Sequence, residues 1–174
     1  VDVVFLLGAD ELAFDALADS FKVYIGTHGD AGAHAADVIL PASTYTEKSG
    51  LYLNTEGRVQ QANRANFAPG EGKEDWAILR ALSDVLGHKL PFDSLAALRS
   101  QLFEAHPDLA NEGECVKGDA GAIADLAKKA GAVKGQAFVS PIHDFYLTNP
   151  IARASAIMAE CSQLKKGLAA DAAE

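Results

Sequence analysis

The chain has 174 residues, of which 49% are hydrophobic and 22% charged, which is ordinary for a globular protein of one domain or slightly more. Its net charge of −9 argues against direct contact with nucleic acid or with an anionic membrane surface. No apolar run reaches the roughly 18 residues of a membrane-spanning helix, and the opening residues lack the pattern of a signal peptide.

The first letters, VDVV, read as part of a strand and contain no methionine, so we expect a fragment of a longer protein. The two cysteines, Cys115 and Cys161, are far apart and belong to no Cys-x-x-Cys pair. Iron–sulfur and structural zinc sites need four ligands at close spacing. We therefore expect two reduced cysteines and no metal site in this chain.

Three apolar segments within the first 41 residues predict strands, at residues 1–7, 22–26 and 36–41. Between them, residues 10–21 predict a helix capped by Asp10, and residues 27–36 have room for two helical turns. Continuous apolar strands joined by short helical links are typical of a parallel sheet covered on both faces. The predicted fold class is α/β, with a Rossmann-like, mostly parallel sheet.

Residues 51–60 predict a β-hairpin, with Gly57 supplying the left-handed position of its turn. Leucine spacing predicts helices at 75–86 and 94–105, and Pro107 stops the second. The composition changes from that proline onward, so we divide the chain into an α/β domain of residues 1–106 and a helical C-terminal extension of residues 107–174.

The extension predicts a short helix near Ile123 to Ala130 and a closing helix from Asn149 to about Lys165. Asn149 is the predicted cap of the closing helix, and Pro150 suits its first position. Its apolar stripe comprises Ile151, Ala154, Ile157 or Met158, Cys161 and Leu164. We leave open whether this helix packs on its own sheet or docks on another polypeptide.

The letters GTHGDAG, residues 26–32, have glycines three apart after a strand. A phosphate-binding nest of backbone N–H groups is one interpretation, but we favour a turn into a short helix. His28 and His34 flank this turn without a carboxylate or thiol at ligand spacing. No Gly-x-Ser-x-Gly elbow surrounds Ser43 or Ser49, so neither predicts a nucleophile.

The loop and hairpin from Thr44 to Arg58 concentrate polar residues. We interpret the adjacent Glu47 and Lys48 as solvated charges. Asn54, Glu56 and Arg58 share side-chain parity near the hairpin turn, where a carboxylate and a guanidinium can hold the turn by a charge-assisted hydrogen bond. We favour this structural role over ligand contact.

The stretch HAADVILPASTYTEKSGLYLNTEGRVQ, residues 34–60, resembles the molybdopterin oxidoreductase superfamily, which has similar Ala-Asp-Val-x-Leu-Pro, Glu-Lys-x-Gly and Asn-x-Glu-Gly-Arg-x-Gln segments. Within it, the chain is most similar to the family of large iron–sulfur subunits of respiratory complex I. Residues 23–41, 74–87 and 144–162 carry the same resemblance, and the last of these is not shared by molybdenum enzymes. Ala35 departs from the basic residue expected there.

The resemblance implies a truncated molybdopterin-type domain that has lost its cofactor and kept a scaffolding role. It implies no catalytic, cofactor-binding or metal-binding residue here, only vestigial positions of the pterin loops: Thr27, His28, Glu47, Asn54, Glu56 and Arg58. Iron–sulfur clusters are expected in the N-terminal part of the parent subunit. The implied partners are other subunits of the peripheral arm, on the cytoplasmic or matrix side of the membrane, with no nucleic acid and no membrane insertion.

Three functions follow from these observations. The first is a non-catalytic part of the proton-pumping NADH:quinone oxidoreductase, which leaves open whether the fragment counts as an enzyme. The alternative is the bis-pterin-binding part of a molybdenum enzyme such as a formate dehydrogenase. A free-standing Rossmann-like binding protein is the third. The helical sequence after Gln60 favours the first, because a molybdenum enzyme would continue into a β-rich domain there.

Overall fold

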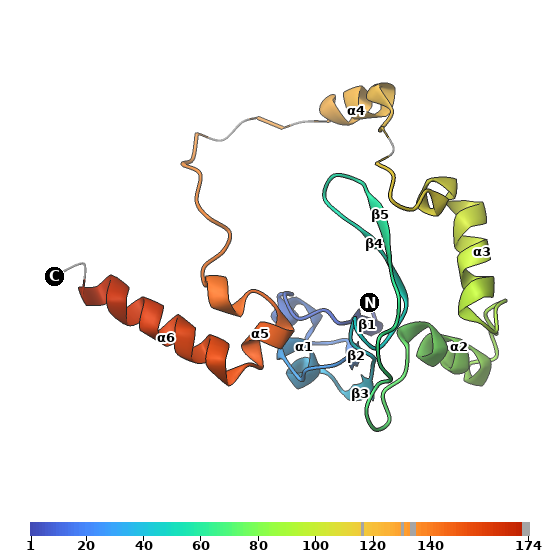
Figure 1. The fold of residues 1–174 in the computed structure, drawn as a ribbon, viewed down its shortest axis with the longest axis horizontal. Coiled ribbons are helices and arrows are strands. Elements are labelled where there is room, and N and C mark those ends of the chain that lie inside the picture. The colour runs from blue at the N-terminus through green and yellow to red at the C-terminus, as the bar shows by residue number, and fades with distance from the viewer. Residues whose placement is uncertain (116, 130, 133–134, 172–174) are drawn as a thin grey trace. The chain divides into compact units, whose positions relative to one another are not determined.

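The structure is a computed structural model that describes residues 1–115, 117–129, 131–132 and 135–171. Its contacts divide the chain into two compact units. Unit 1 comprises Val1–Ser43, Gly70–Asp75 and Phe138–Glu174, and unit 2 comprises Thr44–Pro69 and Trp76–Ala137. Figure 1 shows the helices and strands of each unit along the chain.

Unit 1 is built on a parallel sheet of strands β1 (Val3–Leu7), β2 (Phe21–Gly26) and β3 (Val38–Pro41), in the order β1-β2-β3. Val3 pairs with Phe21 and Val23 with Val38. The predicted parallel sheet is therefore confirmed. The core lies on one face, where Leu6, Tyr24 and Ala33 are buried together.

The two connections of this sheet lie on the same face. The 3-10 turn η1 (Phe14–Leu17) and helix α1 (Ala31–Ala35) both contribute side chains to the core around Tyr24. Right-handed crossovers between strands taken in sequential order put every connection on one side of a sheet. The sequence predicted covering on both faces, and this topology explains why unit 1 supplies it on only one.

The opposite face carries large apolar side chains that are exposed to solvent. Val3, Phe5 and Leu7 alternate with the core residues of β1 and are between 42% and 54% exposed. The face continues onto the neighbouring strands through Phe21 and Val38, at 48% and 39%. A parallel sheet is normally buried on both sides, so this face is one that a protein has reason to cover.

The helix predicted at residues 10–21 is wrong, because only Phe14–Leu17 form a single 3-10 turn. Asp10 does not cap it. Its carboxylate instead bonds the backbone of Gly32 and the hydroxyl of Tyr24, which holds the chain after β1 away from a helical path. The link at 27–36 is likewise shorter than predicted, with the five residues of α1.

Unit 2 contains the predicted hairpin, formed by antiparallel strands β4 (Gly50–Leu53) and β5 (Val59–Ala62). Gly57 has φ 88° in its turn, as the sequence predicted. Helices α2 (Asp75–Val85) and α3 (Leu95–Ala105) follow, with Ser94 capping the second. Arg80 is buried and joins α2 to the next loop through Phe92 O at 2.8 Å and Asp93 at 2.6 Å.

The rest of unit 2 returns to the hairpin. After the 3-10 turn η2 (Pro107–Ala110), the backbone forms isolated bridges from Glu112 to Val59 and from Cys115 to Arg58. The short helix α4 spans Ala120–Ala127, slightly before the predicted range, whose end at Ala130 lies outside the described residues. Sequence spacing alone gave no sign of the return to β5.

The C-terminal part of unit 1 differs from the single closing helix of the prediction. It forms the 3-10 turn η3 (Phe145–Leu147), the short helix α5 (Pro150–Arg153) and the longer α6 (Ala156–Asp171). Asn149 caps α5 as predicted. The break at Ala154 and Ser155 interrupts the predicted apolar stripe, which is why Ile151, Ala154 and Leu164 are exposed. No helix in the described part of the chain is long and apolar enough to span a membrane.

Candidate functional site

The carboxyl ends of the parallel strands are the first place to look for a site, because open α/β sheets bind ligands there. In unit 1 this edge is formed by the residues after β1, Gly8 to Glu11, and after β2, Thr27 to Asp30. It therefore contains the GTHGDAG turn that the sequence offered as a phosphate nest. Its hydrogen bonds decide what the edge can hold.

Asp10 occupies the position that an anion would need. The residue is 6% exposed, and its Oδ1 accepts the N–H of Gly32 at 2.8 Å. Its Oδ2 accepts the hydroxyl of Tyr24 at 3.1 Å. A phosphate approaching the start of α1 would have to displace this buried carboxylate. The backbone N–H at Gly32 is thus already satisfied by the protein itself.

The glycines of the turn have a packing reason. A Cβ on Gly26 would overlap the Tyr24 ring, and one on Gly32 would overlap the carbonyl oxygen of Ala9. Both approaches are closer than real Cβ atoms make. The two glycines make room for a buried tyrosine and for a close approach of backbone. Their spacing therefore arises without a phosphate ligand.

Arg153, on α5, reaches the same edge of the sheet. Its Nε donates to Asp30 Oδ2 at 2.5 Å, one Nη donates to Glu11 Oε1 at 2.6 Å, and the other Nη donates to Leu147 O at 3.1 Å. The hydrogen bond to Glu11, followed by that to Asp30, raises the pKa of Arg153 above its usual value. The guanidinium thus neutralises carboxylates that follow both β1 and β2.

Thr27 and His28, two of the predicted vestigial positions, follow β2 on this edge. The Thr27 hydroxyl and His28 Nδ1 share a hydrogen bond of 2.5 Å. Thr27 is exposed and His28 half-buried. The two side chains are placed to bond each other, and the structure gives them no charged partner among the described contacts.

The other predicted positions lie in unit 2, and three of them build the hairpin turn. Asn54 Oδ1 accepts the N–H groups of Glu56 and Arg58 at 3.1 and 2.9 Å. Arg58 Nε donates to Glu56 Oε1 at 2.6 Å, which confirms the predicted charge-assisted bond. This bond lowers the pKa of the Glu56 carboxyl below its ordinary value.

Arg58 also binds a segment that is distant in sequence. Its Nη1 donates to the carbonyl oxygen of Gly113 at 2.6 Å, and Cys115 Sγ donates to the carbonyl oxygen of Glu56 at 2.7 Å. The turn is therefore tied to residues that lie more than fifty positions later. Sequence reasoning missed this contact, since the return of residues 112–115 to the hairpin leaves no local pattern.

Glu47, the last of the predicted positions, stabilises its own loop. Its Oε2 accepts the N–H of Thr44 at 3.1 Å, and its N–H donates to Thr44 O at 2.9 Å. The carboxylate closes a tight turn before β4. Its role in the structure is that of a loop-capping side chain.

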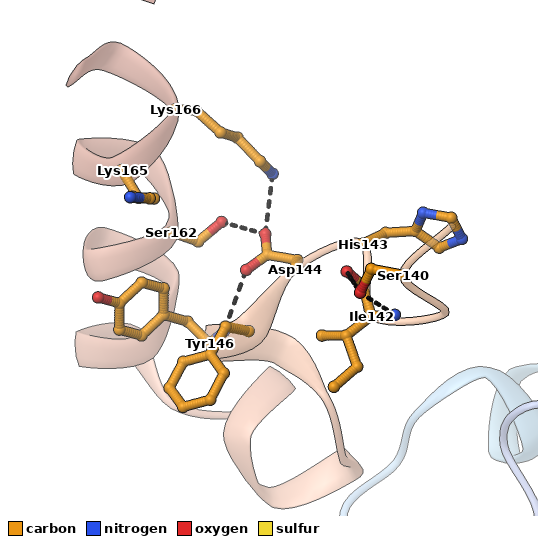
Figure 2. Close-up of a pocket in the computed structure, with 9 residues that line it drawn as sticks. Ser140, Ile142, His143, Asp144, Tyr146, Ser162, Lys165 and Lys166 are labelled. Atoms are coloured by element: carbon orange, nitrogen blue, oxygen red, sulfur yellow. Dashed lines mark hydrogen bonds and ion pairs between the residues drawn. The ribbon is translucent and has the colours of Figure 1, made fainter. Parts of the chain in front are cut away.

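A separate cavity of about 540 Å³ lies between the connector before η3 and helix α6 (Figure 2). Asp144 lies at its centre and accepts hydrogen bonds from Ser162 Oγ at 2.5 Å, Lys166 Nζ at 3.0 Å and Tyr146 N. The pKa of Asp144 is lowered by Ser162 first and then by Lys166. These polar groups satisfy one another, so the cavity presents little that would orient a ligand.

Metal binding finds no support in the part of the chain that the structure describes. There, no group of three or more His, Cys, Asp and Glu residues is close enough to hold a metal ion. Cys115 is exposed and Cys161 half-buried, and both are free cysteines.

Comparison with known proteins gives two family matches. Residues 1–85 match the molybdopterin oxidoreductase family, and residues 110–161 match a family that describes the C-terminal region of the large NADH-ubiquinone oxidoreductase subunit. Together with the parallel sheet of unit 1, the first match shows that the chain contains part of a molybdopterin oxidoreductase-like domain.

Individual relatives point to one branch of this superfamily. The chain is 45% identical over 163 residues to the NADH-ubiquinone oxidoreductase 75 kDa subunit of Reclinomonas americana, covering 94% of this chain and 23% of that protein. It is 46% identical over 165 residues to the mitochondrial 78 kDa subunit of Candida albicans, covering 91% and 23%. It is 43% identical over 166 residues to the mitochondrial NADH dehydrogenase (ubiquinone) iron-sulfur protein 1 of Solanum tuberosum, covering 94% and 22%.

The chain therefore belongs to the family of the 75/78 kDa subunit of complex I and corresponds to its C-terminal portion. It spans less than a quarter of the length of these relatives.

The cofactor implied by the superfamily, a pterin dinucleotide, does not fit the edge of the sheet that follows β1 and β2. Its phosphates are anionic, and favourable partners would be free N–H groups or cations. The edge presents the carboxylates of Asp10, Glu11 and Asp30, and the N–H of Gly32 is already bonded. The guanidinium of Arg153 is shared between two of those carboxylates.

Proposed function

We propose that this chain is a non-catalytic, structural part of the large iron–sulfur subunit of proton-pumping NADH:quinone oxidoreductase. The identity of 43–46% to such subunits over more than nine-tenths of the chain supports the assignment. The oxidation of NADH and the reduction of quinone are activities of the whole complex. The fragment contributes a folded scaffold to it.

The observation that carries this proposal is the bonding of Arg58. The motif that resembles a pterin-binding loop uses its guanidinium on Glu56 and on Gly113 O, both within unit 2. Asn54 spends its side-chain oxygen on two backbone N–H groups of the same turn. Side chains that hold their own backbone in this way support a structural role for the motif.

The exposed apolar face of the sheet agrees with a scaffold. Val3, Phe5, Leu7, Phe21 and Val38 would be poorly placed in water, because contiguous apolar surface on soluble proteins usually marks a contact. The relatives contain more than three-quarters of their length outside the matched region. We propose that this face packs against the remaining polypeptide of the parent subunit.

The proposal extends to the surroundings of the fragment. Iron–sulfur clusters lie in the N-terminal part of the parent subunit, in keeping with the name of the potato relative. The partners are other subunits of the peripheral arm, on the matrix side in mitochondria or the cytoplasmic side in bacteria. We also propose that residues 1–106 and 107–174 are the family's two sequence domains, and the family matches at 1–85 and 110–161 support that boundary.

The alternative function is the bis-pterin-binding part of a molybdenum enzyme such as a formate dehydrogenase. The match of residues 1–85 to the molybdopterin oxidoreductase family is the observation in its favour. The match of residues 110–161 to a complex I subunit favours the structural role instead.

An Arg58→Ala variant tests the choice. If the residue holds the turn, the Tm of the chain falls by about 2–4 °C or less, since the pair with Glu56 is exposed. Amide exchange at Gly57 and Gly113 accelerates in the same variant. Thermal melting and hydrogen-exchange mass spectrometry measure both effects.

The control for this experiment is Lys128→Ala, which removes another exposed cation of unit 2 from its pair with Asp125. It should leave exchange at Gly57 unchanged. An Arg58→Ala variant with unaltered melting and exchange, but with weakened binding of GDP to the chain, would support the molybdenum-enzyme alternative.

A further inference from the structure

The position of Arg153 is not explained by a scaffold role alone. It lies 123 residues after Asp30 and 142 residues after Glu11, yet it bonds both. Those carboxylates follow adjacent strands at the edge where α/β sheets bind ligands. We propose that the segment Phe145–Arg153 is an internal occupant of this edge and closes it to phosphate-bearing ligands. The proposal stands on unit 1 itself and goes beyond the assignment to complex I.

The first step is the fit of the guanidinium. Two of its nitrogens donate to carboxylates and the third donates to the carbonyl oxygen of Leu147, within the segment itself. The side chain is only 26% exposed, and the Asp30 side chain is 20% exposed. A partly buried guanidinium with all three nitrogens engaged is held in one orientation, as a bound ligand would be.

The second step is the electrostatics of the edge without Arg153. Asp10, Glu11 and Asp30 would then be three carboxyl groups at one end of a small sheet with no described cation among them. Carboxylates in such proximity repel one another and raise each other's pKa. Arg153 supplies the opposite charge, while Asp10 supplies the anion at Gly32 N–H. Both positions that a zwitterionic ligand could use are taken by the chain.

The third step is the anchoring of the segment at its other end. Asp144 immediately precedes η3 and accepts hydrogen bonds from Ser162 and Lys166 of α6 (Figure 2). Asn149 caps α5 through Ala152 N at 2.9 Å, which fixes the start of the helix that carries Arg153. The occupant is thus a short, internally braced segment with one anchor at the sheet and another at α6.

The test compares Arg153→Ala with Lys165→Ala in the full chain by hydrogen-exchange mass spectrometry. Lys165 carries a cation in the same part of unit 1 and, within the described residues, does not bond Asp30 or Glu11. The proposal expects Arg153→Ala to accelerate exchange at least tenfold in peptides covering both 145–153 and 27–36. Lys165→Ala should leave both peptides at the wild-type rate. Equal exchange in the two variants would overturn the proposal.

A double-mutant comparison keeps the test decisive if Arg153→Ala folds poorly. Arg153→Lys retains the charge but can no longer bond both carboxylates through a fork, so exchange should lie between wild type and Arg153→Ala. Asp30→Asn should accelerate exchange in 145–153, and adding Arg153→Lys to it should cause less further change than it does alone. Fully additive effects would mean that the two residues act separately, and the proposal would fail.

Inorganic pyrophosphate probes the closure directly. Millimolar pyrophosphate should leave exchange at Gly32 and across 145–153 unchanged in the wild-type chain, because Asp10 and Arg153 hold their positions. Increased protection of Gly32 together with faster exchange in 145–153 would show that a phosphate ligand displaces the segment. That result would overturn the proposal without affecting the assignment to complex I, which rests on unit 2 and on the relatives.

Discussion

At the scale of single residues, Tyr24 organises unit 1. Its side chain is 2% exposed, and its ring fills the space that Gly26 and Gly32 leave open. Its hydroxyl donates to Asp10, and Asp10 in turn accepts the N–H of Gly32. One buried tyrosine therefore connects the central strand, the residues after β1 and the start of α1.

A Tyr24→Phe variant removes the hydroxyl and leaves the ring. The loss of one buried hydrogen bond should lower the free energy of unfolding by about 1–2 kcal/mol. Chemical denaturation at neutral pH measures this loss. A free energy within error of wild type would mean that the Tyr24–Asp10 bond contributes nothing net.

The same residue predicts a dependence on alkaline pH. Burial, followed by the hydrogen bond to Asp10, raises the pKa of Tyr24 to about 12 from 10.0. Because the folded pKa is the higher one, this contribution to stability is complete below pH 10 and is lost as the pH rises towards 12. Wild type should therefore lose stability faster than Tyr24→Phe across this range, and parallel curves would contradict the shift.

At the scale of elements, the corner between η3 and α6 depends on one carboxylate. Ser162 is 3% exposed and donates to Asp144, which also accepts Lys166 and the N–H of Tyr146. The break before α6 lets the helix turn so that Ser162 can meet Asp144. The corner is held mainly by polar contacts, since Ile157 and Leu164 of α6 are exposed.

A Ser162→Ala variant should loosen this corner. We expect severalfold faster amide exchange at Tyr146 because the Asp144 carboxylate loses its closest partner. The effect should also depend on pH. Asp144 has a folded pKa below its ordinary value of 3.8, so its contribution is present above that pH and is lost as the pH falls below it.

The control for the corner is Ser140→Ala, which lies on the same cavity but bonds Ile142 instead of Asp144. Its exchange at Tyr146 should match wild type. Exchange at Tyr146 that is the same in Ser162→Ala and Ser140→Ala would show that Asp144 does not hold the corner.

The elements that the sequence predicted well are those with a strong local signal. Continuous apolar runs defined β1, β2 and β3, Gly57 defined the hairpin turn, and Ser94 and Asn149 were read correctly as caps. Each of these signals involves residues that are near one another along the chain. The charge-assisted bond between Glu56 and Arg58 was predictable for the same reason.

The features that the sequence did not reveal depend on distant partners. Asp10 looked like a helix cap because its bond to Gly32 spans 22 residues. Arg153 looked like a solvent-facing residue of a closing helix, whereas its partners precede it by more than a hundred positions. A single sequence contains no signal for such pairs, so the charged end of the sheet could not be predicted.

At the scale of the whole molecule, the structural role predicts an absence of cofactors. The purified chain should contain no stoichiometric molybdenum, iron or zinc, because no described residues form a cluster of ligands. Elemental analysis by plasma mass spectrometry, with pterin fluorescence after oxidation as a second measurement, tests this. One equivalent of any of these metals would contradict the structural role.

The division of unit 1 into separate stretches has a consequence for how the protein is made. Its sheet leaves the ribosome early, but Arg153 is translated 123 residues after Asp30. At roughly 5–20 residues per second, that interval lasts roughly 6–25 s. During it, the nascent sheet exposes unpaired acidic groups at one end and an uncovered apolar face, which together make it a natural client for chaperones. The folding of this region is thus completed after most of the chain has been synthesised, whichever element forms first.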